Sequence, residues 1–184
     1  NDSAITKITF EYNGDSITDL SNISISSDEK FLLIGTDHGH VFLYDVIEGR
    51  VSKKVLTFPL GDKILWTKFI SKDWIISASK TGGIYLYCLA DQRSRYFSLE
   101  SNILQFITVK SPSHLSHLIH IALITEDAKL RILSCDTSSE EVSIANKVLS
   151  LETNKVALAS SGKKLYLSTM QDSSSTFYLV SGLF

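Results

Sequence analysis

Three evenly spaced histidines are the first residues of this 184-residue chain whose types suggest chemistry. His114, His117 and His120 are three residues apart, and on a helix this spacing would place them on one side, as a metal site requires. On a strand, an odd spacing points successive side chains to opposite faces. Because the sequence after His117 is typical of a strand, we expect His117 and His120 to diverge, and we predict no metal site.

Other reactive constellations give no stronger signal. His38 and His40 share a hairpin with Asp37, but no further metal ligand follows nearby in the sequence. The chain contains no G-x-S-x-G elbow, no phosphate-binding glycine loop and no H-E-x-x-H motif. We therefore predict a protein that is not an enzyme, with no catalytic residue, no cofactor and no small-molecule substrate.

Composition narrows the class of protein. The formal net charge of -2 disfavours a general nucleic-acid binder, which normally has a basic face. Cys88 and Cys135 form no C-x-x-C pair, which favours a reducing compartment and an intracellular location, nuclear or cytoplasmic. We expect both cysteines to be small packing residues. No apolar run is long enough for a membrane span, so we expect no membrane partner.

The elements that hold these residues are predicted to be short strands. Segments rich in Ile, Leu, Val, Tyr and Phe alternate with clusters of Gly, Asp, Asn and Ser, and helical periodicity is nearly absent. Trp66 and Trp74 lie on such segments, and we expect them to be buried. Many short strands at near-even spacing indicate a sandwich, a barrel or a propeller.

An internal repeat decides among these architectures. GTDHGHVFLYDV (35–46), ASKTGGIYLYCL (78–89) and ITEDAKLRILSC (124–135) align without gaps, and a weaker fourth copy ends at Val180. The last aromatic or aliphatic position of the copies falls at residues 44, 87, 133 and 180, which are 43, 46 and 47 residues apart. This period matches one four-stranded propeller blade of about 40–50 residues.

One segment resembles a known family. Residues 26–50, SSDEKFLLIGTDHGHVFLYDVIEGR, are similar to the blade core of WD-repeat proteins, with a Ser-x-Asp turn, a strand, a glycine-containing hairpin and a strand that ends in Tyr44-Asp45. His38 and Thr81 stand where that family often has a buried Asp, and Asp127 keeps the Asp. The resemblance implies an all-β fold, a β-propeller of the WD-repeat type with about four blades visible.

The repeat predicts blades at residues 17–60, 63–100 and 103–149, a partial blade at 154–184, and a lone outer strand within 1–12. Two interpretations stay open. The chain is part of a larger propeller of about seven blades, which we favour, or it forms a small ring. In either case we expect burial of Leu33, Ile34, Val41, Leu43, Ile75, Ile76, Ile84 and Leu86.

The resemblance implies binding through loops at the two faces of a propeller. One face is expected to present a mostly acidic set of loop residues: Asn13, Asp15, Asp37, His38, Asp62, Lys80, Glu126, Asp127 and Asp172. The other face is expected to present a basic set: Arg50, Lys53, Lys54, Arg93, Arg95, Lys163 and Lys164.

The resulting hypothesis is a non-catalytic scaffold, a propeller subunit of a eukaryotic multiprotein complex. Its partners would be other protein subunits and the remainder of its own propeller. The alternative is an RNA-contacting propeller of a ribonucleoprotein or ribosome-assembly complex, which would use the basic face and bind in a salt-dependent way. A propeller enzyme or carbohydrate binder is disfavoured, because it needs convergent carboxylates or metal ligands.

Overall fold

The computed structural model describes the backbone of residues 11–12, 15–16, 19–47, 50–59, 61–109, 117–136, 138, 143–153, 155–161, 164–171 and 174–180. All regular structure within these ranges is β-strand, which confirms the all-β prediction. In the same ranges, no helix is long and apolar enough to cross a membrane. The chain divides into two compact units, residues 1–79 and residues 80–184.

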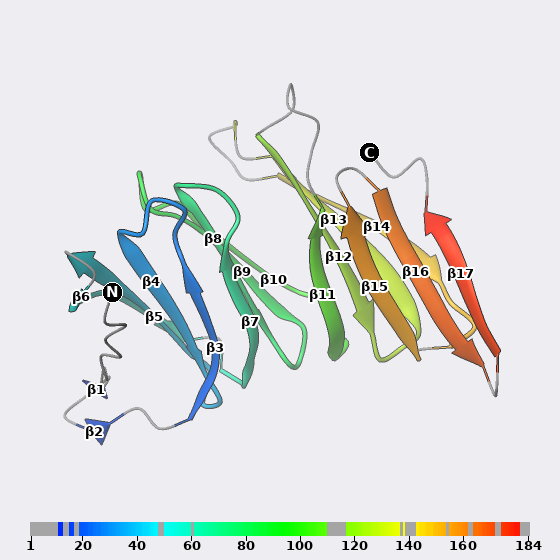
Figure 1. Ribbon diagram of the computed structural model, residues 1–184, viewed down its shortest axis with the longest axis horizontal. Helices are drawn as coiled ribbons and strands as arrows, with labels where there is room; N and C mark the ends of the chain where they lie inside the picture. Colours follow the sequence, from blue (N-terminus) through cyan, green and yellow to red (C-terminus); the bar gives the residue numbers. More distant parts are fainter. Residues whose placement is uncertain are drawn as a thin grey trace, which may run out of the picture. The chain divides into compact units, whose positions relative to one another are not determined.

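Four sheets of three or four strands follow one another along the sequence, after a two-stranded sheet near the N-terminus, and three of them have four strands (Figure 1). The first sheet consists of β3 (Leu20–Ile25), β4 (Phe31–Thr36), β5 (His40–Ile47) and β6 (Arg50–Pro59). The second consists of β7 (Ile64–Phe69), β8 (Trp74–Ser79), β9 (Gly83–Cys88) and β10 (Ser94–Ser98). The third consists of β11 (Ile103–Val109), β12 (Leu118–Thr125), β13 (Lys129–Asp136) and β14 (Ser143–Ser150). The fourth has three strands, β15 (Val156–Ser161), β16 (Lys164–Gln171) and β17 (Ser174–Val180).

The repeat positions fall on equivalent strands. Residues 44, 87, 133 and 180 lie on β5, β9, β13 and β17, each of which is the third strand of its sheet in chain order. Residues 1–10 of the expected lone outer strand lie outside the described residues. Its last two residues form β1 (Glu11–Tyr12), which pairs with β2 (Asp15–Ser16).

The Ser-x-Asp turn of the first sheet is fixed by side-chain hydrogen bonds. Ser26 is buried, and its Oγ accepts the backbone N–H groups of Lys30 at 3.1 Å and Phe31 at 2.9 Å. The same hydroxyl donates to Asp28 Oδ1 at 2.8 Å. This turn closes the β3–β4 hairpin, so a short polar motif positions two strands.

The core of the first unit confirms the expected pattern of burial. Leu33, Ile34, Val41 and Leu43 have no exposed surface, and the same holds for Ile75 and Ile76 on β8. The first sheet and β7 pack closely at Gly35, where an added Cβ would lie 2.6 Å from Ile64 Cγ2. A glycine at this point therefore lets the strands approach.

A hydrophobic core of the second unit lies between the third and fourth sheets. Ile84 and Leu86 are fully buried, as expected. The cluster between the sheets contains apolar side chains from both: Val109, Ala122, Ile124, Leu130, Ile132, Val156, Leu165 and Leu167. Face-to-face burial of this kind stabilises a stacked array of sheets through the hydrophobic effect.

The aromatic and sulfur-containing residues mostly follow the expectations. Trp74 is 6% exposed, which confirms its burial, whereas Trp66 is only half-buried. Cys88 and Cys135 are free thiols and both are buried, which confirms their packing role. Burial raises the pKa of the Cys135 thiol to about 12, so this side chain remains protonated at neutral pH.

Candidate interaction surface

Three equivalent hairpin turns adopt the same unusual backbone conformation. The turns between the second and third strands of the first three sheets contain Gly39 (φ 80°), Gly82 (φ 92°) and Ala128 (φ 54°). These residues occupy one position of the sequence repeat. Glycine adopts this left-handed region without steric cost, whereas alanine at position 128 does not.

In the second and third sheets, backbone hydrogen bonds join the turn to the loop that follows the sheet. Leu99 N–H donates to Gly82 C=O at 3.0 Å, and Leu151 N–H donates to Ala128 C=O at 2.8 Å. Glu126 N–H donates to Asn102 C=O at 2.9 Å. Residues 80–82, 99–102, 126–128 and 151–153 of the second unit are therefore called the second turn surface.

The first unit has a smaller turn surface, which comprises residues 37–39 and 61–63 (the first turn surface). Lys63 Nζ lies 3.0 Å from Asp37 Oδ1, and His38 Nε2 lies 3.0 Å from Asp19 Oδ2. A Cβ added at Gly39 would lie 2.6 Å from the backbone nitrogen of Asp62. Asp37, His38 and Asp62, which were predicted to face partners, are thus brought to one edge of this unit.

Buried hydroxyl groups support the turns, and the sequence analysis missed them. Thr36 Oγ1 accepts His40 N–H at 3.0 Å and donates to the His40 carbonyl at 3.2 Å. In the third sheet, Thr125 Oγ1 donates to the Lys129 carbonyl at 3.3 Å. Ser79 holds the equivalent place in the second sheet and is also buried. The recurrence of Thr, Ser and Thr at one repeat position was the available signal.

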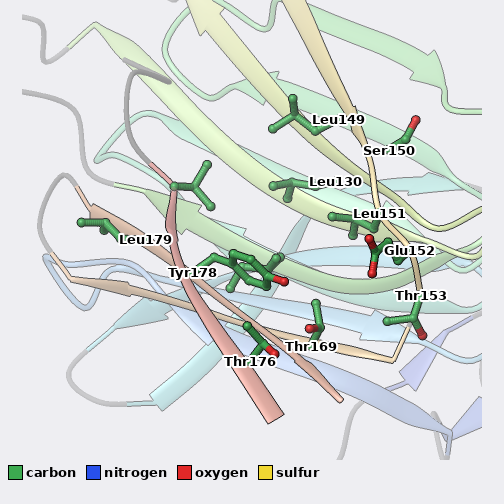
Figure 2. A pocket seen from close by; sticks show the side chains of 12 residues that line it. Leu130, Leu149, Ser150, Leu151, Glu152, Thr153, Thr169, Thr176, Tyr178 and Leu179 are labelled. Carbon is green, nitrogen blue, oxygen red and sulfur yellow. The ribbon is translucent and has the colours of Figure 1, made fainter. Parts of the chain in front are cut away.

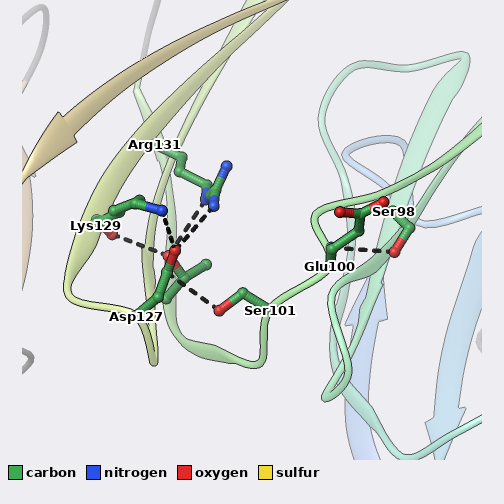
Figure 3. A network of polar contacts seen from close by, with 7 residues as sticks. Ser98, Glu100, Ser101, Asp127, Lys129 and Arg131 are labelled. Carbon is green, nitrogen blue, oxygen red and sulfur yellow. Dashed lines mark hydrogen bonds and ion pairs between the residues drawn. The ribbon is translucent and has the colours of Figure 1, made fainter.

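Asp127 is the centre of the most developed polar network (Figure 3). Its carboxylate lies 2.6 Å from Lys129 Nζ and 3.2 Å from Arg131 Nη2, and it accepts a hydrogen bond from Ser101 Oγ at 3.1 Å. The bond from Lys129 is the largest cause that holds the pKa of Asp127 far below its ordinary value, followed by bonds from Thr125 and Ser101. Asp127 therefore remains ionised with its orientation fixed.

Glu126, beside Asp127, is also oriented. Asn102 Nδ2 donates to Glu126 Oε2 at 2.7 Å, and Glu126 is exposed. Lys80 is exposed on the same second turn surface. Three of the residues that were predicted to face partners, Lys80, Glu126 and Asp127, thus belong to one surface.

The residues of the predicted basic face are less concentrated. Arg93 Nε lies 2.6 Å from Asp91 Oδ2, so its charge is engaged locally. Arg95 and Lys164 are exposed. The structure describes only the backbone of Asp15, Arg50, Lys53 and Lys54, and Asn13, Lys163 and Asp172 lie outside the described residues.

The histidine series does not form a metal centre in the described part of the chain. His120 is buried on β12, with Nδ1 2.8 Å from Ser134 Oγ, and burial lowers its pKa. His117 precedes β12 and lies near Asp136. Hydrogen bonds from Ser138 are the largest cause that lowers the pKa of Asp136, and the interaction with His117 is the smallest. His114 lies outside the described residues. No group of three or more His, Cys, Asp or Glu side chains with metal-binding geometry occurs among the described ones.

A pocket of about 460 Å³ lies between the third and fourth sheets. Figure 2 shows Leu130 and Leu149 of the third sheet on one side of Tyr178, and Thr169 and Thr176 of the fourth sheet on the other. Glu152 is the only charged residue among the described residues that line the pocket. The pocket is thus lined by six apolar residues and six polar or charged residues among the described ones.

Two solved structures have the same arrangement of strands. The crystal structure of the WD40 domain of SCAP from fission yeast matches with a TM-score of 0.60 over 90% of this chain and 43% of that chain, at 11% sequence identity. The C-terminal WD40 domain of Sif2 matches with a TM-score of 0.58 over 80% of this chain and 42% of that chain, at 16% identity. The chain has the fold of a WD40 β-propeller.

The WD40 likeness concerns the fold, because the sequence identities are low. The chain spans less than half the length of each of the two WD40 chains. No protein-family model and no curated protein matches the sequence. In this WD40 propeller fold each of the four sheets is a blade. The second turn surface combines hairpin turns within blades, at 80–82 and 126–128, with the loops that join successive blades, at 99–102 and 151–153.

Proposed function

We propose that this propeller is a non-catalytic scaffold for protein–protein interaction and a subunit of a eukaryotic multiprotein complex. The observation that supports the proposal is the second turn surface. Its loops are joined by backbone hydrogen bonds. Asn102 orients the Glu126 carboxylate, and Ser101 and Lys129 orient the Asp127 carboxylate. A surface that is already ordered loses less conformational entropy when a partner binds.

The proposed partners are other protein subunits and the remainder of this propeller, in an intracellular location that is nuclear or cytoplasmic. Loops on a rigid β scaffold are common binding elements, because the scaffold fixes their positions while their side chains vary. The exposed turn residues are polar and charged, which suits a surface that must stay soluble before the partner binds.

The alternative function is RNA contact through the basic face. Exposed Arg95 and Lys164 are the observation in its favour. We rank it second because several basic side chains are paired with nearby carboxylates. Arg93 forms an ion pair with Asp91, Lys30 lies 3.8 Å from Asp28, and Lys72 lies 4.0 Å from Asp73. Local pairing of this kind reduces the positive potential that attracts phosphates.

The test is purification of the tagged chain from its native cells under gentle conditions, with and without ribonuclease. We expect stoichiometric protein partners that survive ribonuclease, are lost with Glu126→Lys and are retained with Arg95→Glu. Loss of the partners with ribonuclease and with Arg95→Glu, but not with Glu126→Lys, would support the RNA alternative. A chain that purifies alone would contradict both functions. Equal melting temperatures of the variants are the control for folding.

A further inference from the structure

A bulge recurs in the first strand of each complete blade. One extra residue interrupts the pairing register immediately before Asn22 on β3, Trp66 on β7 and Gln105 on β11. Bulges commonly re-aim the side chains next to them. The residue after the bulge has a side-chain amide in two blades and an indole in the third, so the bulge itself does not require an amide.

Both amides bond to the backbone of the strand that begins the next blade. Thr67 N–H on β7 donates to Asn22 Oδ1 at 3.2 Å. Leu158 N–H on β15 donates to Gln105 Oε1 at 3.0 Å, and Gln105 Nε2 donates to the Val156 carbonyl. An equivalent position of the first and third blades thus provides a link to the blade that follows.

The link from Gln105 is complete on both sides. β15 is an edge strand of the fourth sheet, where it pairs with β16 alone, and it lies beside β11 (Figure 1). Backbone groups that are removed from water need hydrogen-bond partners. Glutamine offers a donor and an acceptor on one planar group, and Gln105 uses the donor for Val156 and the acceptor for Leu158.

This link lies directly after two loops of the second turn surface. Gln105 follows the loop 99–102 by three residues, and Val156 follows the loop 151–153 by three residues. The turn 126–128 bonds to both loops through backbone N–H groups. The loops are therefore connected twice, once through the turn and once through the Gln105 amide.

We propose that Gln105 is a positioning residue of the second turn surface, because its amide holds β15 against β11 and so fixes the loop 151–153 beside the loop 99–102. Without the amide the two loops would be joined through the turn alone. The surface would then lose part of the fixed shape that limits the entropic cost of binding. The proposal rests on the proposed scaffold function, since it concerns the surface that we assign to partner binding.

The test is amide hydrogen exchange of the full chain without a partner, followed by NMR. Gln105→Met keeps a long side chain but removes the amide. We expect the Leu158 amide, which bonds to Gln105, and the Leu151 amide, which bonds to Ala128, to exchange roughly tenfold or more faster in this variant. Gln92 is exposed in another turn, and the charge control Gln92→Glu should leave both rates unchanged.

Gln105→Glu separates hydrogen bonding from packing. At pH 7 the ionised carboxylate has no proton for the Val156 carbonyl, so both amides should exchange faster than in the wild type. The protonated acid can donate to Val156 and accept from Leu158. Relative to the wild type at the same pH, exchange should therefore slow again as the pH falls to about 4.

Three outcomes overturn the proposal. Unchanged Leu158 exchange in Gln105→Met would contradict the link, and so would a pH-independent effect of Gln105→Glu. Faster exchange at Leu158 alone, with Leu151 unchanged, would contradict the positioning role. Slow exchange at Leu123, which is fully buried on β12, is the control for folding, and if Gln105→Met loses it, the pH series of Gln105→Glu decides. Glu126→Lys is scored by partner binding, so failure of the scaffold function is distinguished from failure of the link.

Discussion

Three equivalent hairpin turns of this chain place a residue in the left-handed backbone region, and in two of them, at Gly39 and Gly82, that residue is glycine. Gly82 is the most constrained, because an added Cβ would lie 2.4 Å from the Ser101 carbonyl oxygen. Gly61 has a similar φ of 79°, but an added Cβ would meet nothing within 4 Å. An alanine at position 61 would therefore test the cost of the left-handed backbone alone. An alanine at position 82 would add the cost of a steric clash with the Ser101 carbonyl.

We predict that Gly82→Ala destabilises the protein clearly more than Gly61→Ala. Gly61→Ala should cost at most about 1–2 kcal/mol, the steric cost of a left-handed alanine. Gly82→Ala must in addition displace backbone, and we expect a loss above about 2 kcal/mol. Urea denaturation monitored by circular dichroism measures both values. Equal losses would show that the second turn surface is not packed as described.

Asp127 gives a prediction about pH. Its pKa is lowered in the folded state from an ordinary 3.8, so the unfolded chain binds this proton more readily. The stabilisation by Asp127 is therefore present above pH 3.8 and declines as the pH falls below that value towards the folded-state pKa. The difference in unfolding free energy between the wild type and Asp127→Asn should shrink between about pH 5 and pH 2. A difference that is constant over this range would contradict the network in Figure 3.

Residue types predicted the charged turns but not their partners. Asp127 was identified from its position in the repeat, whereas its bond to Ser101 joins residues that are 26 apart, a contact that only the folded chain creates. Thr36 and Thr125 bond to backbone carbonyl groups, which every residue type provides, so the recurrence of a hydroxyl residue at one repeat position is the signal that could have found them. Trp66 was expected to be buried and is half-buried.

At the scale of elements, the core depends on inner strands that are buried on both faces, so that four consecutive residues in the middle of β5 are buried whereas its last residue is exposed. Leu43 has no exposed surface, whereas Ile47 on the same strand is 59% exposed. We predict that Leu43→Ala costs about 2–5 kcal/mol of unfolding free energy, because it removes buried methyl groups and leaves a cavity. Ile47→Ala is the matched control and should cost less than about 1 kcal/mol. Denaturant titration measures both, and similar losses for the two would mean that the strand register is wrong.

The third strand of each blade could be predicted because its pattern recurs at a period of 43 to 47 residues. The environment of β17 could not. Phe177 and Leu179 have the residue types of a core position, and their exposure depends on whether a further strand or sheet lies beside them. A sequence pattern reports which residues favour burial, but it does not report which neighbour provides it.

At the scale of the whole molecule, the WD40 fold was predictable from the repeat and from residues 26–50, although no family model matches the sequence. Packing and turn geometry maintain this fold at identities of 11% and 16%. Function is less determined, because one propeller fold serves many partners. We propose that the chain forms part of a larger propeller, in keeping with its match to less than half of each WD40 chain.

The most direct test of the scaffold function is hydrogen–deuterium exchange of the chain with and without the protein partner that co-purifies with it. We predict that the partner slows exchange in the second turn surface, at residues 80–82, 99–102, 126–128 and 151–153. We also predict that Glu126→Lys weakens binding of the partner. Unchanged exchange throughout these residues in the partner-bound chain would contradict the assignment of this surface as the binding site.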